Sequence, residues 1–327
     1  MLCSLRKCKL HKSFHMHAST LLRSIFQGVS AIAPTLVVLA AGMGTRFGGD
    51  KQFTALGPHG ETLMDYAIFD AARAGVDRVV LIVRPDALDL IPALQKRYSR
   101  SVRLTAEAQR PNDLPGGTAL PEGRTRPWGT AHAIRSVREV VTGPFIVVNG
   151  DDFYGAQPYR ALVDAQRADD HRTPTWQLAG FALRDTLSPS GPVNRAVCRI
   201  AADGRLLELD EVRGIHDEDG VLRGGAPGQR TIPSDAVVSM NMWGLTPEIF
   251  DVIERSFAAF LTTADLARDE YYLPEAIAVA IGEGRRVQVL PAESAWCGVT
   301  FPEDAAQVRG HLAALAAGGD YPAPLWP

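Results

Sequence analysis

Short apolar runs alternate with segments of helical periodicity through the first half of the chain. The runs are rich in branched residues and too short for isolated helices, so they predict buried strands of a parallel sheet at Leu36–Ala40, Asp77–Val83 and Phe145–Asn149. Apolar residues at helical spacing between them predict helices over Gly60–Gly75, Ala87–Tyr98 and Thr130–Val141. This alternation is typical of a parallel sheet whose ligands bind at the carboxyl ends of its strands.

After about residue 170 the pattern becomes rich in strands. Strands are predicted at Trp176–Ala182, Ala196–Ala201, Leu206–Val212 and Val237–Trp243, followed by helices at Pro247–Thr262 and Tyr272–Gly282. Glycines at Arg213–Gly214 and in Gly224–Gln229 predict surface loops. The expected fold is therefore α/β, a Rossmann-like three-layer domain with a mainly parallel mixed sheet and an added β-rich substrate-binding part.

Composition limits the classes of protein that fit this pattern. With 46% hydrophobic and 22% charged residues, the 327-residue chain has the composition of an ordinary globular protein. Its net charge of −3 argues against nucleic acid as a partner, and no apolar run is long enough to predict a membrane span. The four cysteines form no close pairs, which indicates a reducing compartment, and we expect the cytoplasm.

The first 34 residues differ from the rest because they contain five basic and no acidic residues. This composition resembles an organelle transit peptide, and the alternatives are an extension outside the fold or a true start at Met16. We interpret residues 1–34 as lying outside the fold. One domain is then predicted over residues 35–316, with a C-terminal tail at 317–327.

A glycine-rich turn follows the first predicted strand. Its small and cationic residues are Ala41, Gly42, Gly44, Thr45, Arg46 and Lys51. Such turns let backbone N–H groups approach phosphate, and two nearby cations favour a polyanion. A dinucleotide fingerprint needs glycine where Phe47 stands, and a Walker A loop needs serine or threonine directly after Lys51. The remaining alternative is a turn that only connects two elements.

Three further sites carry candidate chemistry. Asp151 and Asp152 follow a buried strand and a glycine, and paired carboxylates there favour Mg²⁺, although a solvated turn is an alternative. Gly129 and Thr130 stand at a predicted helix start that suits a base or a phosphate, or serves only as a cap. Asn241 lies among apolar neighbours, where a sugar hydroxyl or nearby backbone would satisfy its amide.

Together these motifs resemble a known family. AAGMGTRFGGDKQF, PWGTAHAI and NGDDFYG occur in the order and spacing of the sugar-1-phosphate nucleotidyltransferases, and they look most like the thymidylyl and uridylyl enzymes. The resemblance covers residues 35–310 and is strongest in the first half. It implies an enzyme that joins an NTP, with UTP or dTTP favoured, to a sugar 1-phosphate and releases pyrophosphate. Mg²⁺ is the implied cofactor, and homo-oligomerisation stays open.

The resemblance also implies roles for individual residues. Gly42, Gly44, Thr45 and Ala41 would bind the triphosphate, Arg46 and Lys51 would be catalytic, and Gly129 and Thr130 would contact the base. Asp151 would hold the metal with Asp152, and Asn241, Glu211 and Arg213 would face the sugar phosphate.

Two departures from the family pattern affect these roles. Arg213 stands where many relatives have lysine. In Trp296–Val299, relatives usually carry a metal-binding aspartate that this chain lacks, and Asp304 is the nearest substitute. The alternatives are a metal-dependent glycosyltransferase of related fold, a cytidylyltransferase acting on a non-sugar phosphate, and a non-catalytic nucleotide-binding module.

Overall fold

A computed structural model describes residues 33–42, 53–169, 174–225, 230–299 and 301–326. Residues 1–32, including nearly all of the predicted N-terminal extension, lie outside the described part. So do Gly44, Thr45, Arg46 and Lys51 of the predicted phosphate turn. Within the described part, no helix is long and apolar enough to cross a membrane.

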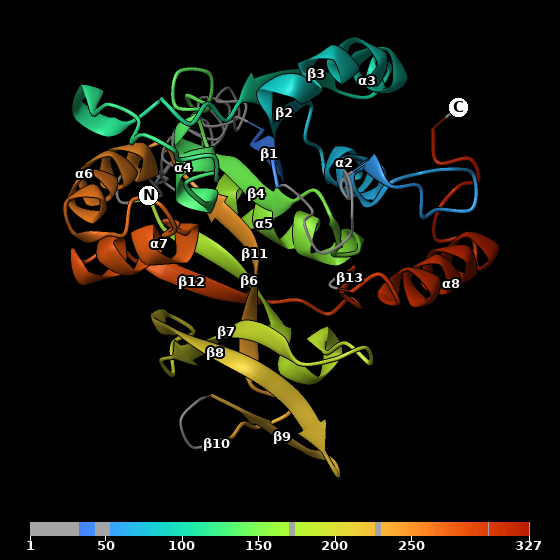
Figure 1. Ribbon diagram of the computed structural model, residues 1–327. Helices are drawn as coiled ribbons and strands as arrows, with labels where there is room; N and C mark the ends of the chain where they lie inside the picture. Colours follow the sequence, from blue (N-terminus) through green and yellow to red (C-terminus); the bar gives the residue numbers. More distant parts are fainter. Residues whose placement is uncertain (1–32, 43–52, 170–173, 226–229, 300, 327) are drawn as a thin grey trace, which may run out of the picture. The chain divides into compact units, whose positions relative to one another are not determined.

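An 11-stranded mixed sheet organises residues 33–326 (Figure 1). Its first half is parallel, in the order β3, β2, β1, β4, and these strands are β1 (Thr35–Ala40), β2 (Arg78–Val83), β3 (Arg103–Ala108) and β4 (Phe145–Asn149). The interiors of β1, β2 and β4 are almost wholly apolar and buried, as strands covered on both faces require. The predicted parallel sheet is thereby confirmed.

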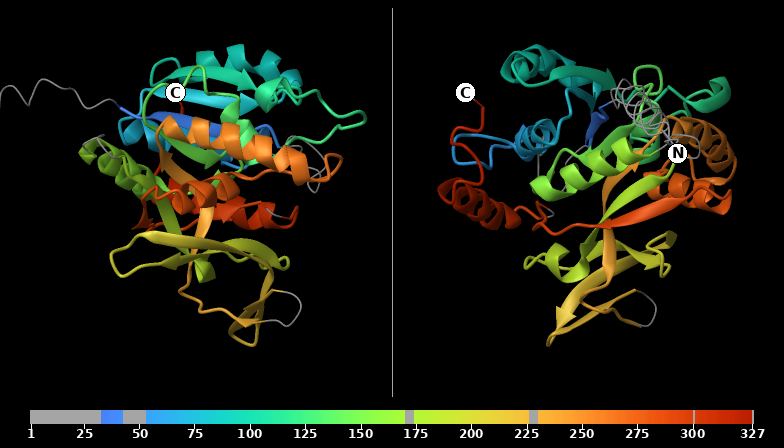
Figure 2. Two further views of the ribbon diagram at one scale, coloured as in Figure 1. Left: turned by 90° about the vertical axis from the view of Figure 1, so that its left-hand side faces the viewer. Right: turned by 180° about the vertical axis from the view of Figure 1, so that it is seen from behind.

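The second half of the sheet is built around one long strand, β11 (Val237–Leu245). Its C-terminal part pairs antiparallel with β4, and an earlier part pairs with β7. The remaining strands of this sheet are β6 (Trp176–Ala182), β7 (Val193–Ile200), β8 (Leu206–Glu218), β9 (Val221–Gly224), β10 (Arg230–Thr231) and β12 (Val287–Pro291). A separate two-stranded pair joins β5 (Asp152–Phe153) to β13 (Cys297–Gly298). Both Figure 1 and Figure 2 show β7 to β10 as a ribbon of strands beside the helix-covered part.

Two apolar layers cover the parallel strands. Alternate β1 residues face opposite layers, with Leu36 and Val38 in one and Val37 and Leu39 in the other. The first layer holds α2 (Leu63–Arg73), α3 (Ile91–Tyr98) and α5 (Ala156–Ala168). The second holds α4 (Thr130–Arg135), α6 (Glu248–Thr263) and α7 (Leu273–Gly282). The three-layer arrangement predicted from the sequence is confirmed.

The C-terminal residues pack onto the first layer. Helix α8 (Asp304–Ala317) forms a third apolar cluster with α2, and this cluster includes Tyr321 and Leu325, which are both buried. The Tyr321 hydroxyl donates a hydrogen bond to Asp70 Oδ2 at 2.6 Å. The segment predicted as a tail thus contributes side chains to a core, while the domain boundary itself stays a prediction.

Several predicted elements needed correction. Arg213–Gly214 is not a surface turn: both residues lie inside β8, where a register shift marks a bulge. Gly214 adopts φ +68°, so the glycine bends the strand without ending it. Helix α4 ends at Arg135 because the next residues continue as turns with hydrogen bonds to the third preceding carbonyl. Gly224 closes β9, and residues 226–229 of that predicted loop lie outside the described residues.

Candidate active site

The carboxyl ends of the parallel strands meet at one edge of the sheet and place the candidate residues there. Ala41 and Gly42 follow β1, Arg84 follows β2, and Gln109 follows β3. Gly150, Asp151 and Asp152 follow β4, and the Gly150 N–H donates to the Leu39 carbonyl at 2.9 Å. The first predicted strand and the aspartate pair are therefore neighbours in space.

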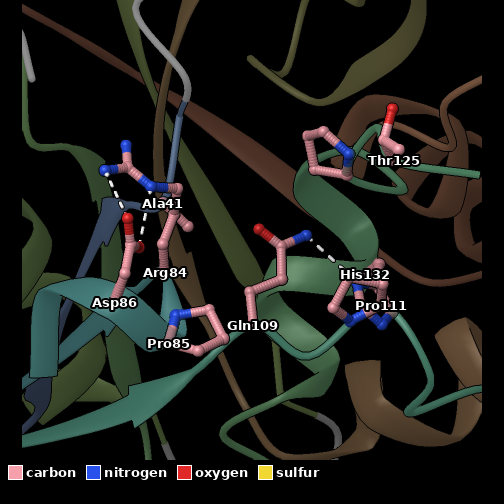
Figure 3. A pocket seen from close by; sticks show the side chains of 9 residues that line it. Ala41, Arg84, Pro85, Asp86, Gln109, Pro111, Thr125 and His132 are labelled. Atoms are coloured by element: carbon pink, nitrogen blue, oxygen red, sulfur yellow. Dashed lines mark hydrogen bonds and ion pairs between the residues drawn. The ribbon is translucent and has the colours of Figure 1, made fainter. Parts of the chain in front are cut away.

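A cavity of about 240 Å³ opens between the ends of β1, β2 and β3 (Figure 3). Its lining residues are Ala41, Arg84, Pro85, Asp86, Gln109, Pro111, Thr125, Pro127 and His132. Arg84 is held at the rim by Asp86, with 3.0 Å between Nε and Oδ1. Four of the nine lining residues are alanine or proline, so the cavity suits a flat, weakly polar group read by few hydrogen bonds.

Two contacts hold the polar side chain of Gln109 in one orientation at this cavity. Its Nε2 donates to the Gly129 carbonyl at 3.1 Å and lies 3.0 Å from His132 Nδ1. Because a carbonyl accepts from this nitrogen, the assignment of amide nitrogen and oxygen is determined by the contacts. Figure 3 shows the amide oxygen turned away from His132, toward the side of the cavity where Ala41 and Arg84 lie. Within the described residues no donor bonds this oxygen, so it is available to a ligand.

His132 holds Gln109 in place, and its two ring nitrogens contact Gln109 and the Asp113 carbonyl. It is 1% exposed, and burial lowers its pKa to about 4, so it is neutral near pH 7. A neutral ring that accepts at Nδ1 carries its proton on Nε2, which lies 3.0 Å from the Asp113 carbonyl oxygen. The histidine therefore supports the amide from behind.

Gly129 and Thr130 form part of the wall behind Gln109. Gly129 has φ +94°, and a Cβ added there would lie 2.5 Å from the Tyr271 carbonyl oxygen, so only glycine fits. The Thr130 hydroxyl accepts a hydrogen bond from the Leu273 N–H at 2.8 Å and ties α4 to α7. Neither residue lines the cavity, so direct contact with a base stays a prediction.

Asp152 is the centre of a hydrogen-bonded network that also includes Asn241. Asp152 is 7% exposed, and its Oδ2 accepts from Asn149 Nδ2 at 2.8 Å. The Tyr154 hydroxyl lies 3.2 Å from the same oxygen and 2.9 Å from the Met240 carbonyl. Asn241 Nδ2 donates to Asn149 Oδ1 at 2.8 Å. The predicted sugar contact and the predicted metal ligand are thus brought together across β11 and β4.

Asn241 owes this position to strain in the backbone. It adopts φ +60° where the β11 register shifts between Ser239 and Trp243. Its Oδ1 accepts from Trp243 Nε1 at 3.1 Å. A non-glycine residue in the left-handed region is uncommon and concentrates at functional sites. The bulge therefore turns the amide toward the end of β4.

Asp151 and Asp152 fit Mg²⁺ by the chemistry of their donors, because Mg²⁺ accepts one or two carboxylates and completes its shell with water and phosphate. Asp151 is partly exposed, whereas Asp152 is buried. No cluster of three or more histidine, cysteine, aspartate or glutamate side chains occurs among the described residues. A metal here would hence rest on the aspartate pair and on the substrate.

Asp304, the substitute ligand inferred from the sequence, is used otherwise. Its Oδ1 accepts from the hydroxyls of Ser188 and Ser190 at 2.8 and 2.7 Å, and its Oδ2 accepts from the Phe301 N–H at 2.8 Å. Both oxygens thus stabilise the start of α8. Both carboxylate oxygens of Asp304 therefore have protein partners that are not part of a metal site.

Glu211 and Arg213 project from the same face of β8, because they are two residues apart, and both are exposed. Glu211 lies opposite Ala196 of β7 in the strand register. The structure therefore puts the two residues on the β-rich part, as predicted, without a direct contact that would assign them a substrate.

Comparisons with known proteins agree with this geometry. Residues 36–112, from β1 to just beyond β3, match the family model of the MobA-like NTP transferase domain. The bifunctional protein GlmU of Novosphingobium aromaticivorans is 26% identical over 279 residues, which are 84% of this chain and 49% of that protein. GlmU of Gluconacetobacter diazotrophicus is 27% identical over 262 residues, 79% of this chain and 46% of the relative.

These similarities are to nucleotidyltransferases, and they support the predicted resemblance to the sugar-1-phosphate nucleotidyltransferases. It spans about half the length of the curated relatives it matches. The resemblance to this family and the nucleotidyltransferase class of enzyme that were predicted from the sequence are confirmed.

Solved structures show the same fold at low identity. The inositol-1-phosphate CTP transferase from T. maritima aligns with a TM-score of 0.58 and 15% identity, over 86% of this chain and 96% of that one. The UDP-glucose pyrophosphorylase from Acinetobacter baumanii aligns with a TM-score of 0.55 and 15% identity, over 86% and 93%. The Rossmann-like fold predicted from the sequence is confirmed.

The comparisons also draw attention to one residue that sequence reasoning missed. Gln109 lies inside the segment matched by the family model and lines the cavity. It directly follows β3, a strand that was not predicted, because Arg103–Ala108 lies at the sheet edge and alternates polar with apolar residues. That alternation was the available signal.

Proposed function

We propose that this chain transfers a nucleotidyl group from UTP or dTTP to a sugar 1-phosphate, giving an NDP-sugar and pyrophosphate, in the cytoplasm. The observation that carries the proposal is the position of Gln109. Its fixed amide oxygen faces a small cavity at the same sheet edge as Asp151 and Asp152. A base site and a phosphate site on one edge suit a nucleotide that spans both.

In this proposal the base is read by Gln109. Because its nitrogen is committed to Gly129, the side chain offers an acceptor, which fits the N3–H donor of uracil or thymine. The cavity of about 240 Å³ favours a pyrimidine over a purine by size. Gly129 would act by holding this amide, and Thr130 by holding the helix behind it.

The proposed reaction needs no protein nucleophile. An oxygen of the sugar phosphate attacks the α-phosphorus of the NTP, a new P–O bond forms, and the bond to the β-phosphate breaks to release pyrophosphate. Ala41, Gly42, Gly44 and Thr45 would offer backbone N–H groups to the triphosphate. Arg46 and Lys51 would neutralise charge on the leaving pyrophosphate.

Asp151 and Asp152 would hold Mg²⁺, which supplies positive charge to the phosphate oxygens when it is bound. Asn149 and Tyr154 orient Asp152 by hydrogen bonds, so the carboxylate is preorganised. Asn241, Glu211 and Arg213 would face the sugar phosphate from the β-rich part.

A cytidylyltransferase is the second candidate, and two observations favour it. One structural neighbour is described as an inositol-1-phosphate CTP transferase. Cytosine also has an amino group that can donate a hydrogen bond to the Gln109 amide oxygen. The base is therefore decided by experiment.

The test is a screen of UTP, dTTP, CTP, ATP and GTP against glucose 1-phosphate, N-acetylglucosamine 1-phosphate and inositol 1-phosphate, with pyrophosphate release as the readout. We expect Mg²⁺-dependent release with UTP or dTTP and a sugar 1-phosphate. Gln109→Met should raise the KM of the favoured nucleotide by about tenfold or more, while Gln95→Met, a control on α3, should not change it.

Each alternative gives its own result in this screen. A preference for CTP with inositol 1-phosphate would replace the proposal by the second candidate. Nucleotide binding without pyrophosphate release would indicate the non-catalytic module. Turnover of an NDP-sugar donor, again without pyrophosphate, would indicate a glycosyltransferase.

A further inference from the structure

Arg195 of β7 is a buried cation close to the proposed metal site. It is 9% exposed, and its guanidinium lies 5.1 Å from the ring centroid of Trp296. Its Nε donates to the Thr186 hydroxyl at 3.2 Å, its Nη1 donates to the Asn194 carbonyl at 2.8 Å, and its Nη2 donates to the Thr186 carbonyl. These contacts hold the guanidinium in one orientation.

Every hydrogen-bond acceptor of Arg195 within the described residues is neutral. A guanidinium has five N–H groups, and the three contacts above leave about two of them without an acceptor. No carboxylate lies within ion-pair distance of Arg195 in the described part of the chain. Burial lowers the pKa of Arg195, and the negative charges of Asp152 and Glu211 raise it. The charge is thus buried and influenced by carboxylates without being paired.

A second buried arginine of the same chain shows what a structural role looks like. Arg135 is 5% exposed, and it pairs with Asp113 and with Glu254, each at 2.6 Å. Burying an arginine without such a partner is costly, because water is removed and no opposite charge replaces it. The difference between the two arginines indicates an anionic partner for Arg195 that none of the described residues supplies.

The surroundings of Arg195 link this missing anion to the reaction centre. Trp296, which stacks on Arg195, leads into β13, and Gly298 of β13 pairs with Asp152 of β5. A Cβ at Gly298 would lie 2.6 Å from Asp152 Oδ1 and 2.7 Å from the Trp296 ring. The segment Trp296–Val299 contains no carboxylate, so it does not neutralise the nearby cation.

We infer that Arg195 binds the anionic group of the acceptor substrate and holds it beside Asp152. The inference rests on the proposed function and deepens it by naming the residue that selects an acidic acceptor. Two sources share this chemistry: the phosphate common to all sugar 1-phosphates, and a carboxylate carried by a uronic acid 1-phosphate. A guanidinium recognises both through paired N–H donors.

The test uses Arg195→Met and Arg195→Lys in the full chain, with Arg199→Met as the matched control. Arg199 lies four residues further along β7, is exposed, and pairs with Glu208 on the surface. Arg195→Met should raise the acceptor KM by about tenfold or more and leave the nucleotide KM within about threefold. Arg195→Lys should recover part of the loss, because it keeps the charge and loses the fork geometry. Arg199→Met should behave as the wild type.

Two acceptors distinguish the source of the anion. If Arg195 binds the phosphate, Arg195→Met raises the KM of glucose 1-phosphate and of glucuronic acid 1-phosphate by the same factor. If Arg195 binds a carboxylate, Arg195→Met raises only the KM of glucuronic acid 1-phosphate. Unchanged KM values for both acceptors, or equal losses for acceptor and nucleotide, would overturn the inference.

Folding and activity are controlled separately. If Arg195→Met does not fold, Arg195→Lys decides, and an unchanged acceptor KM in that variant refutes the inference. If the wild type shows no turnover, calorimetry with glucose 1-phosphate and glucuronic acid 1-phosphate takes the place of kinetics. Binding that is lost in the Arg195 variants then supports the inference although the proposed function fails, and absence of binding to the wild type refutes both.

Discussion

His132 makes the stability of this protein depend on pH in a way that can be measured. In the folded chain its pKa is about 4, because burial disfavours the charged ring, whereas an exposed histidine titrates near pH 6.5. At pH values between about 4 and 6.5, His132 therefore takes up a proton when the protein unfolds. The stabilisation by neutral His132 is complete above about pH 6.5 and is lost as the pH falls toward 4.

The size of the effect follows from the two pKa values. At about pH 5 an unfolded histidine is almost fully protonated and the folded one almost fully neutral, which lowers the free energy of unfolding by about 2 kcal/mol relative to neutral pH. Protonation in the folded state would also place an N–H at Nδ1 facing the Gln109 amide nitrogen. The same titration therefore weakens the hold on the proposed base-reading amide.

The assay is urea unfolding of the wild type and of His132→Asn at about pH 7.5 and about pH 5. Asparagine keeps an acceptor near the Nδ1 position and does not titrate. It should be less stable than the wild type at neutral pH, because it fills less space and loses the contact with Asp113. Its loss of stability on acidification should be smaller than that of the wild type by about 2 kcal/mol. Equal losses in both proteins would show that His132 is not responsible.

Two further predictions concern buried or proposed catalytic carboxylates. Asp151→Asn should lower kcat by about a hundredfold or more, with an unchanged Tm, because it removes the proposed metal ligand from a partly exposed position; near-normal Mg²⁺-dependent turnover would contradict this. Burial raises the pKa of Asp70 to about 6, and its Oδ1 has no hydrogen-bond partner, so wild-type stability should fall as the pH rises from about 4 through 6. Asp70→Asn should then be more stable than the wild type at about pH 8 by about 1–3 kcal/mol and show no such gain at about pH 4, and a gain that is constant with pH would refute the explanation.

Elements that are buried on both faces could be predicted from the sequence with little error. The runs at Leu36–Ala40 and Phe145–Asn149 have no polar face, so the residue types alone predict that they are buried. The observed strands differ from the predicted bounds by one residue or none. Elements with weak or interrupted patterns were missed or misplaced. Strands β3 and β12 and helices α5 and α8 were not predicted, and Gly214 was interpreted as the end of a strand that in fact continues.

The sequence by itself determined the chemistry available at the site. A glycine-rich turn, an aspartate pair and a helix start follow from residue types at short range, and so does the resemblance to a known family. Four of the predicted nucleotide-contacting residues remain predictions because they lie outside the described residues: Gly44, Thr45, Arg46 and Lys51.

Only the tertiary structure decided which side chains meet. Asn241 bonds Asn149 across 92 residues of chain, Gln109 bonds the Gly129 carbonyl 20 residues away, and Asp304 is bound by two serines more than 100 residues earlier. A hydrogen bond depends on distance and direction within a few tenths of an ångström, and residue types alone specify neither. Geometry also distinguishes two arginines that look alike in the sequence. Arg135 forms ion pairs with two carboxylates. Arg195 donates only to neutral oxygens among the described residues, and its charge remains available to the proposed anionic ligand.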